Sequence, residues 1–182
     1  DSTQFIELYN TTSGDISLRN WYFSAGIAYT FPDVVIPAND YFVVAVDSKA
    51  IYNRFGYANA YQWTSGGLSP SGEAVVIKNQ NNATIDSVSY DDASPWPTEA
   101  DGNGPSLVLC NPSSDNTNGS NWTYSTFSTN TVINSKRAYG SPGSRDSACL
   151  APKLQISISG NSTTCATGTD GTAVATVTGG TR

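Results

Sequence analysis

The sequence predicts an all-β fold, a β-sandwich with long loops, from three observations. Asn, Ser, Thr and Gly are abundant, whereas Lys, Glu and Leu, which usually fill helix surfaces, are scarce. Apolar residues recur in short alternating segments rather than with helical periodicity. Turn-forming residues separate these segments at short intervals, as in two packed antiparallel sheets. A closed barrel is the alternative architecture that the same spacing allows.

The first two segments alternate between an inward and an outward face. Residues 4–10, QFIELYN, place Ile6 and Leu8 on one side and Glu7 on the other, so that Glu7 faces outward or across to a loop. A second strand region, residues 15–24, follows the turn TTSGD. Its expected inward positions are Ile16, Leu18, Trp21 and Phe23.

The next segments are two short strands, a buried strand and a helix. Prolines divide residues 29–40 into short strands and a turn. Residues 41–47, YFVVAVD, form a near-continuous apolar run, which is typical of a strand buried on both sides. One short helix is expected in residues 48–56, with Ser48 as its N-cap and Gly56 at its end.

The clearest local unit is a hairpin. The segments EAVVIKN and TIDSVSY, residues 73–79 and 84–90, flank the polar loop QNNA. Further strands are expected at residues 106–109 and 121–125.

The composition changes near Ala151, after a stretch rich in Gly, Pro and Ser. We therefore expect residues 1–150 to form the sandwich domain and residues 151–182 to form a short C-terminal β segment. This tail is too short to bury a core of its own. It must pack on the first domain or begin another module.

Charge and hydropathy restrict the partners. The net charge of −6 argues against a nucleic-acid partner, because phosphate binding needs clustered Lys and Arg. No apolar run approaches the roughly 20 residues of a membrane-spanning helix, so no membrane insertion by this fragment is expected. A polar, Lys-poor chain rich in Thr, Ser and Asn is typical of an exported protein. Asp1 is not an initiator residue, so we expect the chain to be a piece of a larger protein.

The residue types argue against an enzyme. The chain has no His, which excludes Ser-His-Asp and Cys-His arrangements within it. The segments GLSPSG and GNGPS lack the spacing and neighbours of a nucleophile elbow and a phosphate loop. A catalytic pair of carboxylates remains conceivable, and its candidates are Glu7, Glu73, Glu99 and Asp101.

Residues 99–122, EADGNGPSLVLCNPSSDNTNGSNW, admit a structural and a metal-binding interpretation. In the structural one, Gly102 and Gly104 supply positive φ angles, and Asp101 and Asn103 bond their own backbone. In the other, carboxylate, amide and carbonyl oxygens hold calcium, although the EF-hand spacing is not met. Calcium is the only cofactor these residues suggest. Its candidate ligands are Asp101, Asn103, Asp115 and Glu7.

Aromatic residues gather in residues 51–63, IYNRFGYANAYQW. They predict either a small core beneath a long loop or a platform on which sugars or peptides stack. The candidate ligand-binding residues are Tyr52, Tyr57, Tyr61 and Trp63.

Five strings in order resemble the lamin-tail domain in its bacterial, exported form. They are FIELYNTTSGDISLRNWYFS, YTFPDVVIPANDYFVVAVD, GLSPSGEAVVIKN with IDSVSYDD and PWP, ADGNGPSLVLCNPSSDNTNGSNW, and GSPG. This resemblance covers Phe5 to Gly143 and implies an immunoglobulin-like β-sandwich. The family normally begins with a further strand upstream of FIELYN, so an edge of one sheet is expected to lack a partner strand.

The tail resembles the opening of the SprB repeat of bacterial surface adhesins. The resemblance rests on the spacing C-x-x-G-x-D-G at residues 165–171 and on the alternating strand that follows. It covers about half of such a repeat, so residues 151–182 are expected to form a partial, truncated copy.

The three cysteines do not have the spacing of a zinc or redox site. We predict a disulfide between Cys110 and Cys149, which in the chain-entropy treatment would stabilise the fold by about 4 kcal/mol. Cys165 would then pair outside this fragment. Three reduced, buried thiols are the alternative.

These features predict a non-enzymatic β-sandwich module, secreted or on a bacterial cell surface, that acts in adhesion and binds a protein or carbohydrate ligand. Two alternatives stay open: an accessory or targeting domain of a secreted hydrolase such as a nuclease or phosphatase, and a carbohydrate-binding module.

Overall fold

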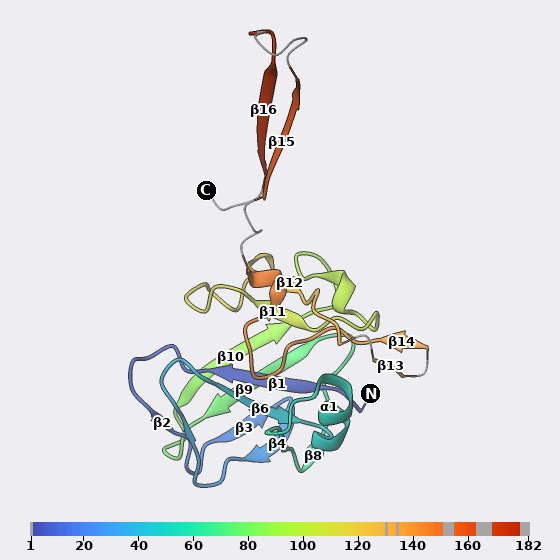
Figure 1. The fold of residues 1–182 in the computed structure, drawn as a ribbon. Helices are drawn as coiled ribbons and strands as arrows, with labels where there is room; N and C mark the ends of the chain where they lie inside the picture. Colours follow the sequence, from blue (N-terminus) through green and yellow to red (C-terminus); the bar gives the residue numbers. More distant parts are fainter. Residues whose placement is uncertain (1, 130, 134, 151–154, 163–168, 179–182) are drawn as a thin grey trace. The chain divides into compact units, whose positions relative to one another are not determined.

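Figure 1 shows the computed structural model of the chain, which describes residues 2–129, 131–133, 135–150, 155–162 and 169–178. The chain divides into two compact units, Asp1–Cys149 and Leu150–Arg182. Among the described residues, none of the helices has the length and apolar character needed to cross a membrane.

Two sheets form the body of the first unit, and its fold is an all-β, immunoglobulin-like sandwich (Figure 1). The first sheet has the order β1 (Phe5–Tyr9), β6 (Tyr41–Ala45) and β7 (Tyr61–Gln62). The second has the order β10 (Thr84–Tyr90), β9 (Glu73–Lys78), β3 (Tyr22–Ala25), β4 (Ile27–Thr30) and β8 (Ser65–Gly66).

Shorter elements complete the first unit. Three strand pairs are β2 (Ile16–Ser17) with β5 (Val35–Ile36), β11 (Leu107–Leu109) with β12 (Trp122–Tyr124), and β13 (Val132–Ile133) with β14 (Lys136–Arg137). The helices are α1 (Ser48–Phe55) and the 3-10 turns η1 (Thr98–Ala100), η2 (Gly119–Asn121) and η3 (Ser147–Cys149).

The hydrophobic core draws side chains from both sheets. Phe42 and Val44 of β6 meet Phe23 of β3 and Val75 and Ile77 of β9 in one buried cluster. The inward positions expected from alternation are confirmed, because Ile6, Leu8, Ile16, Leu18, Trp21 and Phe23 all belong to this cluster or pack against it. The hairpin at residues 73–90 is confirmed as the antiparallel pair β9–β10.

The outer face of the first sheet is also covered. Val43 and Ala45 of β6 are buried as well as Phe42 and Val44, as the apolar run predicted. Helix α1 covers part of this face, where its residue Phe55 makes an edge contact with Phe5 of β1 at 6.0 Å.

Helix α1 ends at Gly56 as predicted, but it begins one residue earlier than predicted, at Ser48. The N-cap is Asp47 rather than Ser48, because Asp47 Oδ1 accepts the Ala50 N–H at 3.0 Å. At the other end Gly56 adopts the left-handed conformation, with φ +75°, and its N–H bonds to Tyr52 O, as predicted.

The second unit contains an antiparallel hairpin of β15 (Gln155–Asn161) and β16 (Thr172–Thr178). One face of the hairpin carries Ile156, Ile158 and Val177, which are 62, 75 and 57% exposed.

Candidate functional site

A surface pocket of about 390 Å³ lies beside the first residues of β6, and its lining includes four aromatic residues among polar and aliphatic ones. We call it the tyrosine pocket. Its lining residues are Val34, Val35, Asp40, Tyr41, Phe42, Tyr57, Asn59, Tyr61 and Gly143.

Two turns bring these residues together. Asn39, with φ +57°, ends the turn before β6, and Asp40 Oδ1 accepts the Tyr41 N–H at 2.8 Å. On the other side, the left-handed Gly56 turns the chain at the end of α1. Strand β7 then pairs in parallel with β6, Val44 opposite Tyr61, so the preceding residues run along the start of β6.

Each of the three pocket tyrosines has one side supported by protein. Tyr61 stacks on Phe42 with centroids 4.7 Å apart, and Tyr41 lies 4.7 Å from the ring of Tyr9. Tyr57 lies directly against Gly143, where a Cβ atom would come within 2.1 Å of its ring. The rings are therefore held in place before any ligand arrives, which reduces the entropy lost on binding.

A buried carboxyl group lies behind the pocket wall. Glu7 Oε2 accepts the Gly143 N–H at 2.6 Å. Burial raises the pKa of Glu7 to about 7 against the lowering effect of this bond, and the nearby Asp146 adds to the rise. Burial, followed by the charge of Glu7, also raises the pKa of both Tyr41 and Tyr57. Glu7 thus braces a loop, one of the two orientations expected from the sequence.

Asp146 holds the loop that carries Gly143. It is 3% exposed, and one of its oxygens accepts hydrogen bonds from the hydroxyls of Ser125 and Ser141. The other accepts the Ala148 N–H at 2.7 Å and caps η3. Sequence reasoning missed this residue. The sequence RDSAC indicates Asp146 only as a helix cap. Its bond to Ser125 joins residues 21 positions apart, which no local pattern indicates.

The structure places the four predicted ligand-binding residues in three different environments. Tyr57 and Tyr61 line the pocket, whereas Tyr52 is 56% exposed and does not line it. Trp63 is 4% exposed, lies in the core and donates from Nε1 to Gly66 O at 3.1 Å, so no ligand can stack on it there.

Of the nine lining residues, sequence reasoning predicted only Tyr57 and Tyr61 as ligand-binding, and the polar and aromatic ones that it missed include Asp40, Tyr41 and Asn59. Asp40 and Tyr41 were assigned to a turn and a buried strand, and Asn59 was passed over in the aromatic loop. The polar residues at the start of the YFVVAVD strand were the only sequence feature that could have indicated a surface site there.

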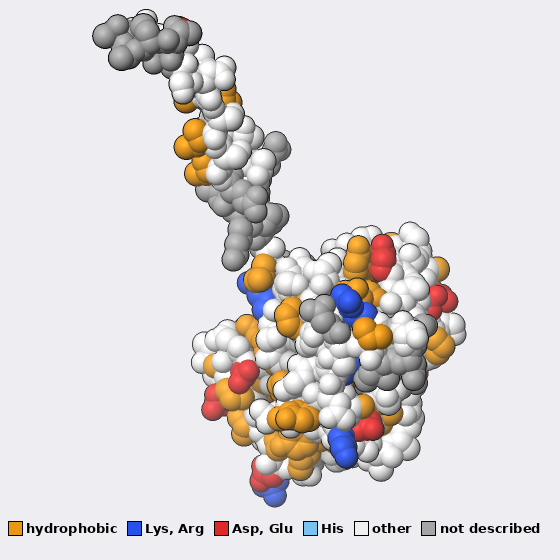
Figure 2. All heavy atoms as spheres, turned by 45° about the vertical axis from the view of Figure 1, so that its right-hand side comes forward, with side chains coloured by type: hydrophobic (Ala, Val, Ile, Leu, Met, Phe, Trp, Pro, Cys, Tyr) orange, Lys and Arg blue, Asp and Glu red, His pale blue; other side chains and the backbone are white. Residues whose placement is uncertain are grey.

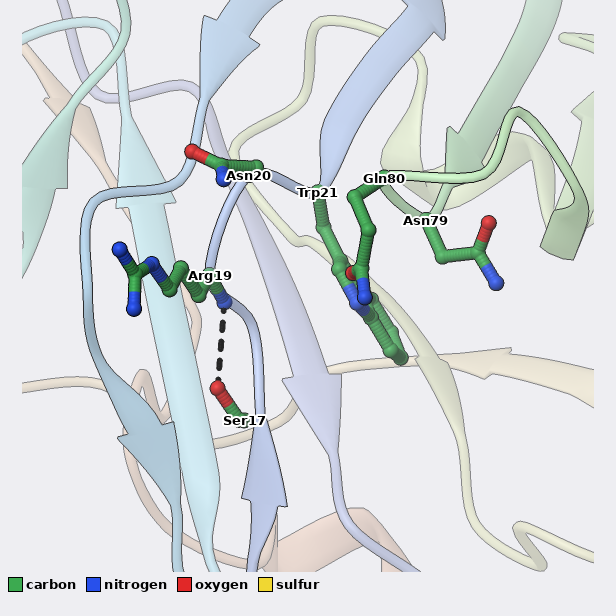
Figure 3. Close-up of a pocket in the computed structure, with 6 residues that line it drawn as sticks. All are labelled: Ser17, Arg19, Asn20, Trp21, Asn79 and Gln80. Atoms are coloured by element: carbon green, nitrogen blue, oxygen red, sulfur yellow. Dashed lines mark hydrogen bonds between the residues drawn. The ribbon is translucent and has the colours of Figure 1, made fainter.

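A second pocket has a volume of about 500 Å³. Its lining is rich in side-chain amides, whereas the lining of the tyrosine pocket includes phenol rings. The residues that line this second pocket, drawn in Figure 3, are Ser17, Arg19, Asn20, Trp21, Asn79 and Gln80. Figure 3 shows the Arg19 guanidinium directed away from the Trp21 indole. The Asn79 side-chain oxygen accepts the N–H groups of Asn81 and Ala83, which leaves its amide nitrogen as the donor that can serve a ligand.

The Asn- and Gly-rich stretch is braced by its own polar side chains. Asp115 Oδ1 accepts the N–H of Thr117 at 2.9 Å and its hydroxyl at 2.7 Å, and these two bonds lower the pKa of Asp115. Asn111 and Asn118 make similar local bonds. Asp101 and Asn103, for which the structural interpretation predicts bonds to their own backbone, are both exposed.

The predicted glycines of this stretch do adopt positive φ angles, +63° at Gly102 and +110° at Gly104. At Gly104 a Cβ atom would lie 2.2 Å from Arg137 O, so only glycine fits this close approach.

The four candidate calcium ligands have separate surroundings. Glu7 accepts a hydrogen bond from Gly143 and Asp115 accepts one from Thr117, whereas Asp101 and Asn103 are exposed. Within the described residues, no group of three or more His, Cys, Asp and Glu side chains comes together as a metal site. Calcium binding stays a prediction. Thermal melting tests it. If calcium binds, the melting midpoint of the protein should rise with added calcium and fall with chelator, whereas the structural interpretation predicts an unchanged midpoint.

The carboxylates considered for catalysis also have structural partners or face solvent. Glu73 Oε1 accepts the Ser69 N–H at 2.7 Å, and the Tyr90 hydroxyl lies 3.4 Å from the same oxygen. Glu99 and Asp101 are exposed, the second of them at the end of η1. These contacts fix loops, and the tyrosine pocket offers rings and hydrogen bonds for binding.

The predicted disulfide is present. Cys110 and Cys149 have Cα atoms 4.9 Å apart and bonded sulfurs, and they join the end of β11 to η3. The prediction for Cys165 lies outside the described residues.

The surface has few charged groups. On the face drawn in Figure 2, charged side chains are few and scattered, and hydrophobic ones lie in several separate groups. Such a surface fits recognition through a local pocket better than through a broad charged or apolar area.

Comparison with known proteins yields one match. No curated protein and no solved structure matches the chain. A family model described as Lamin Tail Domain matches residues 1–92, which include β1 to β10 and both sheets of the sandwich. This match spans half of the 182 residues, and the chain therefore belongs to the lamin tail domain family.

Proposed function

We propose that the chain is a non-enzymatic binding module of an exported or cell-surface bacterial protein, and that it acts in adhesion by binding partner proteins. The tyrosine pocket is the observation that carries this proposal. Tyrosine is enriched in protein interfaces because its ring supplies contact area with little loss of side-chain entropy, and its hydroxyl finds partners at the rim.

The disulfide and the composition support an extracellular setting. Structural disulfides persist in oxidising compartments and are rare in the cytosol. In the pocket, three rings that are each supported on one side by protein give a partner a defined place to dock.

Attachment of coated beads tests the proposal. Beads carrying the full 182-residue chain are applied to panels of immobilised extracellular proteins and of glycans. Retention on a protein surface is expected, with loss in the double variant Tyr57→Ala/Tyr61→Ala. Tyr52→Ala is the matched control, since Tyr52 lies in the same region but outside the pocket. Failure of the wild-type chain to hold beads on any protein surface removes the proposal.

A carbohydrate ligand is the second candidate, and the pocket around Trp21 favours it. An indole with several carboxamides around it offers a sugar both a stacking surface and hydrogen-bond donors. Binding to the glycan panel that falls in Gln80→Ala, an exposed position, would assign the sugar to this pocket. Retention on glycans alone would replace the protein-binding proposal.

We also propose that residues 151–182 begin a repeat of the surface-adhesin type. The exposed apolar face of the β15–β16 hairpin supports this, because a two-stranded hairpin needs further packing for stability. The sequence of the whole protein tests it. Tandem copies of the tail support an adhesin, whereas a neighbouring nuclease or phosphatase domain supports an accessory role instead.

A further inference from the structure

We propose that the tyrosine pocket receives a basic side chain, a lysine or arginine, from the partner protein. This inference rests on the proposed function and names the chemical group that the pocket takes. It depends on the arrangement of three rings and on the balance of charges around them.

The rings present the surface that attracts a cation. The face of an aromatic ring carries negative potential, and an ammonium or guanidinium group within about 6 Å of the ring centre is stabilised by it. Tyr41, Tyr57 and Tyr61 each have one side against protein and together line the same pocket. Tyr41 comes from β6, and Tyr57 and Tyr61 come from the segment that follows α1, so the pocket brings rings from two separate segments into one lining.

The charged groups at the pocket are mainly acidic. Asp40 lines it and is exposed, while Glu7 and Asp146 lie behind its wall near Gly143. Arg145 is the basic group whose charge reaches Tyr41, and its Nη2 is held by Cys149 O at 3.0 Å. Even without Glu7, whose ionisation burial disfavours, Asp40 in the lining and Asp146 behind the wall outweigh Arg145 in a chain of net charge −6, which favours cationic over anionic ligands.

A pair of small probes isolates the charge. Nα-acetyl-lysine methylamide and the norleucine compound of the same length differ in the terminal ammonium group. Each is titrated into the full chain, and amide NMR shifts of Asn59 and Gly143 report binding. We expect the lysine compound to bind about threefold to tenfold more tightly than the norleucine compound.

Variants that change the charge at the pocket should change the affinity for the lysine compound in opposite directions. Asp40→Asn should weaken lysine binding and Arg145→Gln should strengthen it. Asp33→Asn removes an exposed acid outside the pocket and controls for net charge, so it should leave binding unchanged. Tyr61→Ala should weaken both probes, and preserved chemical-shift dispersion elsewhere verifies that the variant is folded.

Equal affinity for the two probes, or no binding of either, overturns this inference. The same holds if Asp33→Asn weakens binding as much as Asp40→Asn does. If beads still attach to a protein through Tyr57 and Tyr61 while the lysine compound shows no preference, only the inference fails. If beads attach to no protein, the proposed function fails whatever the probes do.

Discussion

Glu7 lies on the outer face of β1, surrounded by the Gly143 loop, Tyr41 and Tyr57. The single Gly143 N–H bond does not replace the water that an ionised carboxylate loses on burial, so its pKa rises from 4.5 to about 7. A charge at this position therefore opposes folding, while the same side chain positions the loop that forms one wall of the pocket.

The raised pKa of Glu7 predicts a pH-dependent stability. The folded state holds the proton more tightly than the unfolded state, so this contribution is complete below about pH 4.5 and is lost as the pH rises through about 7. The loss amounts to about 3 kcal/mol. Glu7→Gln should remove most of it and make the protein more stable than wild type at pH 8.

Urea denaturation between pH 4 and pH 8 measures this effect. Glu99→Gln is the control for removal of one negative charge, because Glu99 is exposed. If the stability of Glu7→Gln falls with pH as steeply as that of the wild type, another group is responsible.

At the scale of elements, α1 and the segment after it decide where the pocket lies. The Asp47 cap starts the helix directly after β6, and Gly56 ends it after 8 residues. The chain then returns along β6 in the parallel direction. A longer or displaced helix would move Tyr57 away from Gly143.

The cap predicts a measurable difference between adjacent positions. Asp47→Ala should destabilise the protein by about 1 kcal/mol, because the Ala50 N–H loses its acceptor. Ser48→Ala is the matched control and should have little effect, since the cap bond comes from Asp47. Denaturation midpoints of the two variants provide the test, and a larger loss in Ser48→Ala would contradict the assignment.

At the scale of the whole molecule, the disulfide joins two segments that follow the sandwich. Cys110 lies after β11 and Cys149 at the end of the Gly143 loop region, 39 residues apart. The bond therefore holds the chain that carries Asp146 and Gly143 close to the β11–β12 pair. It limits the unfolded chain as well as the folded one.

Loss of this bond should lower the free energy of unfolding by about 4 kcal/mol. Urea denaturation of the double variant Cys110→Ser/Cys149→Ser measures it, with Cys165→Ser as the control. Titration of thiols in unreduced, denatured protein is the independent check. Three reactive thiols per chain would show that the bond is not formed.

Much of the fold follows from local patterns. Alternation identified β1, the β9–β10 hairpin and the inward side chains, because strand periodicity depends only on neighbouring residues. The positive φ of Gly102 and Gly104 and the end of α1 at Gly56 are local for the same reason. The Asp47 cap was missed, since two adjacent polar residues both suit that position.

The sequence by itself determined the all-β class, and it favoured a sandwich over a barrel and the Cys110–Cys149 disulfide over free thiols. Only the tertiary structure decided which aromatic residues reach the surface: Trp63 went to the core, while Tyr41 joined Tyr57 and Tyr61 at the pocket. It also brought Gly143 to Glu7, 136 residues away along the chain. Contacts of this kind arise from strand pairing and burial over long separations, which no short sequence pattern records.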